Sequence, residues 1–467
     1  MSSTSSSSSS STSSPYEPAG HVGQGADIPG PSTRRTGQFE GSSSSRQRAM
    51  NELLPEPFLE ALAIQHALDA AHYNGRLAAA SALAILFQVC STWREVSRSD
   101  PLWQHLTTRI WRRAYRLRAT WRLEYIYWHR TARNFATGRH SIIPHFDPSD
   151  HHHHPNLICR CVALSDTHLA CGFIDGTVRL FDLETRVHVS TYVSENGQLF
   201  GPFSRSISGI VIDNSLIVFA RLDGDVYVDF INGPGPSHAR RAVSGDVVNN
   251  GVLVGFAGSG LWWVGLYAGI AGRAFQIWYR EERVFVGGSL TDPETVRGWH
   301  MLTELVEPVG RVRVTEPELV VACTGSRLVC FALRNPEVWL RDVGSTSGFV
   351  VSSLDASPEA FVVVERSGVG TVRRASTFQR LSRFRLRGSW VRGLWGCMNM
   401  GYVLTYSSSA PASSLRVWDI EPPVGRLCVT LGVRSGEGNS MVANERHVAI
   451  SWNDSMINLL DFGAQNP

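Results

Sequence analysis

Hydrophobic and polar positions along the 467-residue chain change their spacing twice. Residues 1–50 consist mainly of Ser, Pro and Gly and contain almost no large apolar side chains. From Leu53 to Leu106 apolar residues recur at helical spacing, whereas from about residue 157 short β-like runs alternate with Gly and Asp. One helical face is formed by Leu77, Leu83, Leu86, Phe87 and Cys90. The pattern predicts a multidomain α plus all-β protein.

The Ser-rich segment 1–50 is predicted to be a disordered tail, because it cannot bury enough apolar surface to offset the entropy of ordering it. In the helical segment, Ser99 or Asp100 can cap a further helix that has Pro101 in its first turn. Residues 53–106 are therefore expected to form three or four short helices.

This helical segment resembles the F-box, a module that docks on a Skp1-type adaptor of cullin ubiquitin ligases. The resemblance implies adaptor-binding residues, and they are Leu54, Pro55, Leu59, Val89, Cys90, Trp93, Pro101, Leu102 and Trp103. Two features depart from the family: the first segment is longer than usual, and the Pro-x-x-Asp-Leu start of the second helix is missing. The alternative is a helical subdomain whose Trp93 and Trp103 fill its own core.

Residues 107–138 alternate aromatic and Arg side chains, and their helical period predicts a linker helix. Such a helix packs its aromatic residues between two domains while its Arg residues stay solvated. The alternative is a nucleic-acid-binding helix that stacks bases on the aromatic rings. A formal net charge of +3 is too small to favour nucleic acid by itself.

The β-like region contains seven related units of a strand, a turn and a second strand. Two have an Asp-Gly hairpin turn, at Asp175-Gly176 and Asp223-Gly224. The units begin near residues 169, 216, 261, 319, 360, 402 and 447, so their spacings are between 41 and 58 residues. These spacings bracket the blade period of WD40 propellers, and the region resembles a degenerate WD40 domain in which only Trp418-Asp419 keeps the name-giving dipeptide.

A propeller must pair its first and last blades, because otherwise both would leave a strand edge exposed. The last unit ends at Phe462 without an outer strand, and Ser141–Phe146 (SIIPHF) is expected to supply it. The predicted domain is therefore a seven-bladed WD40-like propeller over residues 139–463.

Several other features limit the possible functions. The uncharged stretch 247–272 has a Gly-Ser-Gly turn in its middle, which favours two buried strands over a membrane span. The eight cysteines lack disulfide or zinc spacing and are expected to be reduced core residues of an intracellular protein. The run His151–His154 is interpreted as a loop, so no metal or other cofactor is expected.

All 44 Lys and Arg residues are Arg. Two explanations of the absence of Lys stay open. A GC-rich coding sequence favours Arg over Lys. Alternatively, a subunit of a ubiquitin ligase that has no Lys offers its own ligase no internal acceptor amine. No phosphate-binding loop, metalloprotease motif or nucleophile elbow occurs, so catalysis is not expected.

A non-catalytic propeller binds partners on its rim or on one end face. Candidate substrate contacts on the end face are Arg205, Arg240, Arg241, Trp299, His300, Trp390, Arg392 and Trp395, because Arg and Trp are enriched in binding hot spots. Blade packing for each Trp and simple solvation for each Arg are the alternatives. The segment 373–392 contains seven Arg and no acidic residue, a composition that suits an acidic partner.

The chain from Leu54 to Gly463 also resembles a family of plant regulators of flower and organ growth. The phrases that carry the resemblance are CSTWREVSRSDPLWQHL, RTARNF, HFDPSD, GFIDGTVRLF, WWVGL and GRAFQIW. The resemblance implies a nuclear substrate receptor of an SCF (Skp1-cullin-F-box) ubiquitin ligase. Its F-box would bind a Skp1-like adaptor and the cullin, and its propeller would present transcriptional repressors of the PEAPOD and KIX-domain type for ubiquitination. A ligase-independent transcriptional scaffold and a nucleic-acid-binding regulator are the alternatives.

Overall fold

The fold comes from a computed structural model in which most of the chain after residue 54 is described. The described residues are 55–146, 157–193, 201–213, 215–231, 235–290, 310–315, 318–324, 326–343, 351–386, 394–408, 413–421, 425–434, 436–454 and 456–463. The predicted disordered tail and the four-His run lie outside these ranges, as do the predicted site residues Leu54, Trp299, His300, Trp390 and Arg392.

Five helices precede the β-rich region in the described part of the chain: α2 (Glu56–Asn74), α3 (Ala78–Leu86), α4 (Ser91–Val96), α5 (Asp100–Trp111) and α6 (Trp121–Thr137). The predicted cap is confirmed, because the Ser99 hydroxyl accepts a hydrogen bond from the Leu102 backbone N–H at 3.4 Å and Pro101 lies in the first turn of α5.

The segment predicted as a single linker helix, 107–138, contains parts of two helices. α5 ends at Trp111 because Arg112 adopts a left-handed conformation, with φ 53°. α6 then begins after Thr120, whose hydroxyl accepts a hydrogen bond from the Leu123 backbone N–H at 3.2 Å. Helical periodicity alone did not reveal this break, since no Pro or Gly marks it.

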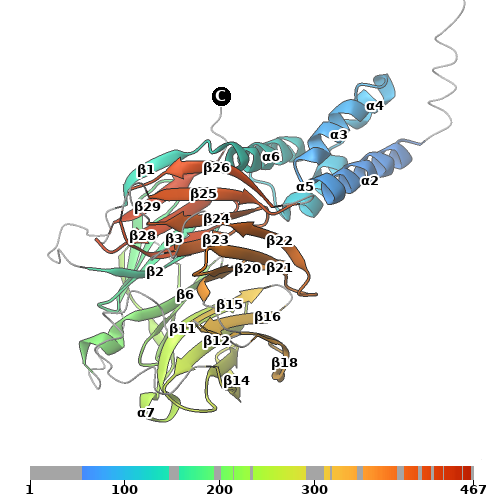
Figure 1. The fold of residues 1–467 in the computed structure, drawn as a ribbon. Helices are drawn as coiled ribbons and strands as arrows, with labels where there is room; N and C mark the ends of the chain where they lie inside the picture. The colour runs from blue at the N-terminus through green and yellow to red at the C-terminus, as the bar shows by residue number, and fades with distance from the viewer. Residues whose placement is uncertain are drawn as a thin grey trace, which may run out of the picture. The chain divides into compact units, whose positions relative to one another are not determined.

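Seven antiparallel sheets follow the helices (Figure 1). Blade 1 contains β2 (Cys159–Leu164), β3 (His168–Phe173), β4 (Val178–Asp182) and β5 (His188–Val193), with β9 (Gly235–His238) added parallel to β5. Blade 2 contains β6 (Ile207–Asp213), β7 (Leu216–Arg221), β8 (Val226–Phe230) and β10 (Arg240–Val243). Blade 3 contains β11 (Val252–Ser259), β12 (Trp262–Ala268), β13 (Phe275–Tyr279) and β14 (Glu282–Gly287). Blade 4 contains β15 (Gly310–Thr315), β16 (Leu319–Thr324), β17 (Leu328–Ala332) and β18 (Asn335–Val343).

The remaining blades have the same order. Blade 5 contains β19 (Val351–Ala356), β20 (Ala360–Glu365), β21 (Val369–Arg374) and β22 (Arg380–Arg385). Blade 6 contains β23 (Leu394–Met398), β24 (Tyr402–Ser407), β25 (Ser414–Asp419) and β26 (Arg426–Gly432). Blade 7 contains β27 (Gly438–Ala443), β28 (His447–Trp452), β29 (Ile457–Asp461) and β1 (Ser141–Phe146). Two smaller helical elements are η1 (Pro202–Arg205) and α7 (Val247–Asn250).

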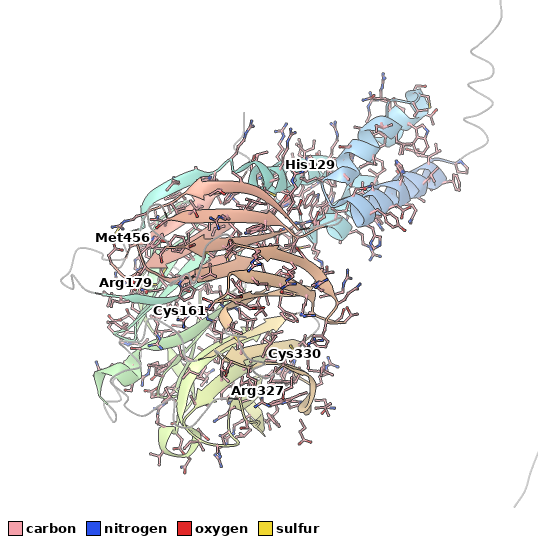
Figure 2. The ribbon with its side chains drawn as sticks, viewed as in Figure 1. His129, Cys161, Arg179, Arg327, Cys330 and Met456 are labelled. Atoms are coloured by element: carbon pink, nitrogen blue, oxygen red, sulfur yellow. The ribbon has the colours of Figure 1, made fainter. Side chains whose placement is uncertain are left out.

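Each of the seven sequence units begins at the second strand of one blade, so the predicted seven-bladed propeller is confirmed. A hydrophobic cluster fills the space between every pair of neighbouring blades, including blades 7 and 1. The side chains drawn in Figure 2 fill the spaces between the sheets. Gly176 and Gly224, each at φ +88°, form the two predicted Asp-Gly turns.

The ring is closed by a strand from before the first blade. β1 pairs antiparallel with β29, and Ile142 and Ile143 lie opposite Leu460 and Leu459. This confirms the predicted closure by residues 141–146. Figure 1 shows β1, drawn in green, beside the red strands of the chain's last blade.

The uncharged stretch 247–272 forms α7, β11 and β12, as two buried strands joined by a turn. Of the helices that the structure describes, none is long and apolar enough to span a membrane.

Candidate functional site

The residues of the F-box resemblance divide between the core and the surface of the helical module, defined here as α2 to α5. Leu59, Leu102 and Trp103 are buried, and the Trp103 indole N–H donates to the Ser97 carbonyl at 2.7 Å. Trp93 and Cys90 are half-buried, whereas Pro55, Val89 and Pro101 are exposed. The motif therefore builds the module's core as well as part of its surface, which leaves the adaptor-binding role a prediction.

Large apolar side chains also lie on the outer face of α2. Phe58 and Leu62 are 52% and 47% exposed, and Tyr73 lies on the same face about three to four turns further along the helix. Ile85 at the end of α3 is 70% exposed. We call Phe58, Leu62, Tyr73, Ile85 and Val89 the apolar stripe. Sequence reasoning missed it, although the signal was available: α2 has apolar residues on both faces, with Leu59, Ala63 and Ala67 buried on the other.

The helical module and the propeller belong to one compact unit, Leu54–Pro467. α6 lies against blades 6 and 7, where the Phe135 ring stacks on Phe462 at 3.9 Å and on Tyr402 at 5.4 Å between centroids. The side-chain amide of Asn134 donates to the Phe462 carbonyl at 2.9 Å. These contacts join residues far apart in sequence and fix α6 to blades 6 and 7, beside the point where β1 closes the ring.

Arg76, between α2 and α3, makes a second connection. Its side chain pairs with Glu421 of blade 6 and with Glu445 of blade 7, the latter at 3.5 Å, and its backbone N–H donates to Glu421 at 2.6 Å. Burial alone would lower the pKa of Arg76, but the two carboxylates raise it above its ordinary value. The ion pairs of Arg76 with Glu421 and Glu445 therefore hold the helical module to the propeller, in addition to the contacts of α6.

The turn after α5 lies over one end of the ring. Arg112 pairs with Glu359 of blade 5, and Arg113 pairs with Asp166 of blade 1. A cavity of about 520 Å³ lies under this turn and is lined by loops of blades 1, 5, 6 and 7. These loops connect first and second strands, so the helical module covers part of that end of the propeller. The opposite end carries the turns between second and third strands.

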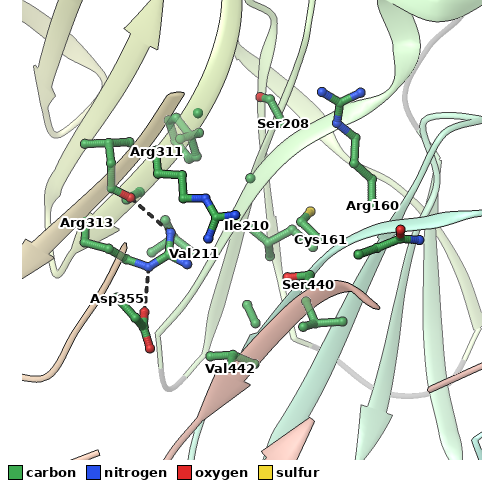
Figure 3. A pocket seen from close by; sticks show the side chains of 18 of the residues that line it. Arg160, Cys161, Ser208, Ile210, Val211, Arg311, Arg313, Asp355, Ser440 and Val442 are labelled. Carbon is green, nitrogen blue, oxygen red and sulfur yellow. Dashed lines mark hydrogen bonds and ion pairs between the residues drawn. The ribbon is translucent and has the colours of Figure 1, made fainter. Parts of the chain in front are cut away.

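The centre of the ring contains a channel of about 800 Å³ that is lined by the first strands of all seven blades. Figure 3 shows Arg160, Arg311 and Arg313 extending into it, with Asp355 beside Arg313. The Arg313 Nε donates to Asp355 at 2.8 Å, and Asp355 also accepts from the Met398 backbone N–H at 3.0 Å. Arg311 lies over the Trp395 ring at 4.3 Å and donates to Ser353 at 2.9 Å.

The channel is positively charged among the residues that the structure describes. Three guanidinium groups and one carboxylate line it, and that carboxylate is engaged by Arg313. Burial lowers the pKa of Arg160, since its charge is partly withdrawn from water. The nearby Cys161 thiol has its pKa raised by burial and stays protonated, so it is no activated nucleophile. The arrangement can bind an anionic group.

The structure disperses the predicted end-face contacts. Arg205 lies in η1 at the entry to blade 2, and Trp395 lies in the channel wall. Arg240 and Arg241 lie on the outer strand of blade 2, where they pair with Glu281 and Asp225. Both arginines belong to β10, and Asp225, the partner of Arg241, lies at the turn between the second and third strands, so their role in partner binding stays a prediction. Trp299, His300, Trp390 and Arg392 lie outside the described residues.

The aromatic residues of segment 107–138 are largely packed. Trp111, Tyr125 and Trp128 are buried, and the Arg113 guanidinium lies 3.9 Å from the centre of the Trp128 ring. Arg118 lies 3.3 Å from the Tyr127 ring centre. Bases cannot stack on buried rings, so this geometry favours the packing interpretation of the segment.

No cluster of three or more His, Cys, Asp or Glu side chains suited to a metal ion occurs in the described ranges. All eight cysteines are free thiols, and most are buried in the blades.

A closed ring of seven blades, each with four antiparallel strands and the first extended by the parallel strand β9, defines a WD40-like β-propeller protein, and a helical module is fixed to one end of the ring. No family model matches the chain. The transcriptional regulator STERILE APETALA of Arabidopsis thaliana is 48% identical over 437 residues, which cover 92% of this chain and 96% of the relative. The chain therefore belongs to the STERILE APETALA family of plant transcriptional regulators.

Solved propellers are also similar, at low identity. The WD40 propeller domain of Doa1 matches with a TM-score of 0.45 and 14% identity, over 67% of this chain and 95% of that one. U3-55K matches with a TM-score of 0.49 and 12% identity, over 66% of this chain and 97% of that one.

Proposed function

We propose that this protein is a non-catalytic nuclear receptor that holds a transcriptional repressor on its propeller and a Skp1-type adaptor on its helical module. As an SCF substrate receptor, it would raise the effective concentration of the repressor's Lys side chains at the ligase, as a tether does. The relative's name, a transcriptional regulator, supports the nuclear and regulatory part of this proposal.

The apolar stripe carries the proposal. Contiguous exposed apolar side chains mark protein-binding surfaces, and Phe58, Leu62 and Tyr73 share one face of α2. Complete burial of one such side chain contributes about 1.5–3 kcal/mol, so the stripe offers enough free energy for a stable complex. Its position on the module that resembles the F-box favours a Skp1-type adaptor as the partner.

The connection between the module and the propeller supports a receptor role. α6, Arg76 and the turn at Arg112 and Arg113 fix the module to four of the blades, so the adaptor and the repressor would keep a defined separation. The channel end away from the module is the proposed repressor site, because Arg160, Arg311 and Trp395 lie near the start of their strands at that end. Arg and Trp are typical hot-spot residues.

The test is a pull-down of a purified Skp1-type adaptor by the full chain. Phe58→Asp with Leu62→Asp should weaken adaptor binding roughly tenfold or more, since 1.4 kcal/mol corresponds to a factor of ten. The control is Val187→Asp, which places an Asp on an exposed apolar position of blade 1. Binding that is absent in the wild type, or equal in both variants, contradicts the adaptor proposal.

A ligase-independent transcriptional scaffold is the second candidate. It is favoured by the two departures from the F-box pattern, the long first segment and the missing Pro-x-x-Asp-Leu start, because both lie in the module that would bind the adaptor. The scaffold alternative predicts that the apolar stripe binds a nuclear regulator other than the adaptor. Repressor levels in cells separate the two candidates: the receptor lowers them in a proteasome-dependent way, whereas the scaffold leaves them unchanged.

A further inference from the structure

On the outer rim of blade 5, several arginine side chains have no acidic partner in the part of the chain that the structure describes. The outermost strand β22 exposes Arg380, Arg383 and Arg385 and contains no acidic residue. On the outer strand of blade 2, by contrast, Arg240 pairs with Glu281 and Arg241 with Asp225. The outer edge of blade 5 therefore differs from that of blade 2 in the balance of its charges.

Strand register places further arginines between blades 4 and 5, on the same face of the sheet. Arg373 lies opposite Arg380 across β21 and β22, and opposite Phe361 on the other side. Phe361 packs against Cys330 of blade 4, and Arg341 is the register partner of Cys330. Arg341, Arg373 and Arg380 therefore lie close together between blades 4 and 5.

Like charges directly opposite one another on a sheet are destabilising. Burial, together with the guanidinium groups of Arg341 and Arg380, lowers the pKa of Arg373. The Nε of Arg341 is buried and has no hydrogen-bond partner among the described residues. Within the same residues, neither Arg373 nor Arg380 forms an ion pair with an acid; Arg373 donates to the Phe378 carbonyl at 3.1 Å. An anionic partner would relieve this repulsion.

The backbone of β22 adds a second, independent feature. β22 is the last strand of its sheet, so its outer edge offers unpaired N–H and C=O groups. Blade 1 shows that an outer edge of this propeller accepts another strand, because β9 pairs parallel with β5 along Ser190 to Val193. The corresponding edge in blade 5 has no such strand among the described residues.

We propose that the outer edge of blade 5 binds an extended, acidic segment of a partner protein, which pairs with β22 and places carboxylates against Arg380, Arg383 and Arg385. Strand addition uses backbone groups for affinity and alternate side chains for specificity. A second copy of this basic edge would be repelled. Nucleic acid would use the charges but not the backbone edge. This site is separate from the apolar stripe and from the channel, and it does not depend on the proposed function.

The test uses a labelled peptide of alternating Glu and Val and measures its fluorescence anisotropy with the full chain. Binding should weaken with added salt and fall roughly tenfold or more in the double variant Arg383→Glu, Arg385→Glu. The control, Arg426→Glu, lies on the outer strand of blade 6 and should bind as the wild type does. If charge reversal lowers the melting temperature, Arg383→Gln with Arg385→Gln replaces it.

Three further probes decide the details. A peptide of alternating Gln and Val should not bind, and a Glu-Val peptide with N-methylated backbone should bind much more weakly. Equal binding of the N-methylated peptide would overturn strand pairing, and equal binding of the double variant would overturn the site. Tighter binding of a DNA oligonucleotide, lost in the same variant, would identify the rim as a nucleic-acid surface and overturn the peptide proposal.

Discussion

Replacing Ile143 in the closing strand β1 tests whether this strand holds the propeller together. The Ile143 side chain is 6% exposed and packs in the cluster between blades 7 and 1, together with Leu459 and Phe173. Ile143→Ala removes three carbon groups at about 0.8 kcal/mol each and leaves a cavity, so the loss is about 3 kcal/mol of unfolding free energy.

The adjacent residue provides a matched control. Ile142 is 50% exposed on the opposite face of β1, so Ile142→Ala should cost much less, about 0.5 kcal/mol. Because hydrophobic clusters join neighbouring blades around the whole ring, Ile143→Ala should lower the midpoint temperature of one cooperative unfolding transition and should not create a second transition. A domain of this size shifts by roughly 2 °C per kcal/mol, which predicts a shift of about 6 °C.

The assay is thermal unfolding followed by Trp fluorescence, with urea unfolding as an independent measure. Equal shifts for the two variants, or an unchanged midpoint for Ile143→Ala, would show that β1 does not close the ring. Deletion of residues 139–148 should have a still larger effect, because it also exposes the edge of β29.

Three other properties can be predicted. Arg76→Ala should lower the unfolding free energy measured in urea by roughly 2–4 kcal/mol, because it leaves two largely buried carboxylates without their cation. Arg98→Ala removes an exposed ion pair and should have little effect, and equal losses in the two variants would contradict this. Burial lowers the pKa of His447 to about 4, below the value of about 6.5 in an unfolded chain, so stability is full above pH 6.5 and falls toward pH 4 as the unfolded state takes up the proton. The loss of unfolding free energy is on the order of 3 kcal/mol. Arg446 lowers the pKa of His447 further, whereas the nearby Asp461 carboxylate raises it without offsetting burial. His447→Gln should flatten the decline in stability between pH 6.5 and 4, and an unchanged slope would assign the decline to other groups. If the absence of Lys protects the chain from its own ligase, Arg98→Lys should shorten its half-life in plant cells, and an unchanged half-life would leave codon composition as the explanation.

Local signals in the sequence determined most of the architecture. The seven units of strand, turn and strand correspond to the second and third strands of each blade, and the absence of an outer strand after Phe462 correctly predicted closure by residues 141–146. The Ser99 cap was also visible, because capping depends on neighbouring residues.

Contacts between distant residues were not predictable in this way. Arg76 and Glu421 are 345 positions apart, and nothing local to either marks the pair. Arg160 and Arg311 share a channel only because both lie near the start of a first strand, in different blades. The place of Arg240 in the outer strand of blade 2 was not predicted either, since strand membership there depends on pairing with β8 and not on the local pattern.

The proposed function requires one chain to bridge an adaptor and a repressor through two separate surfaces. The direct measurement immobilises a Skp1-type adaptor and records the capture of a PEAPOD-type or KIX-domain repressor with and without the chain. We expect capture only when the chain is present, and loss of capture in Phe58→Asp, Leu62→Asp, although that variant still binds the repressor alone. Repressor capture that persists in this variant, or that never occurs with the wild type, would contradict the proposed function.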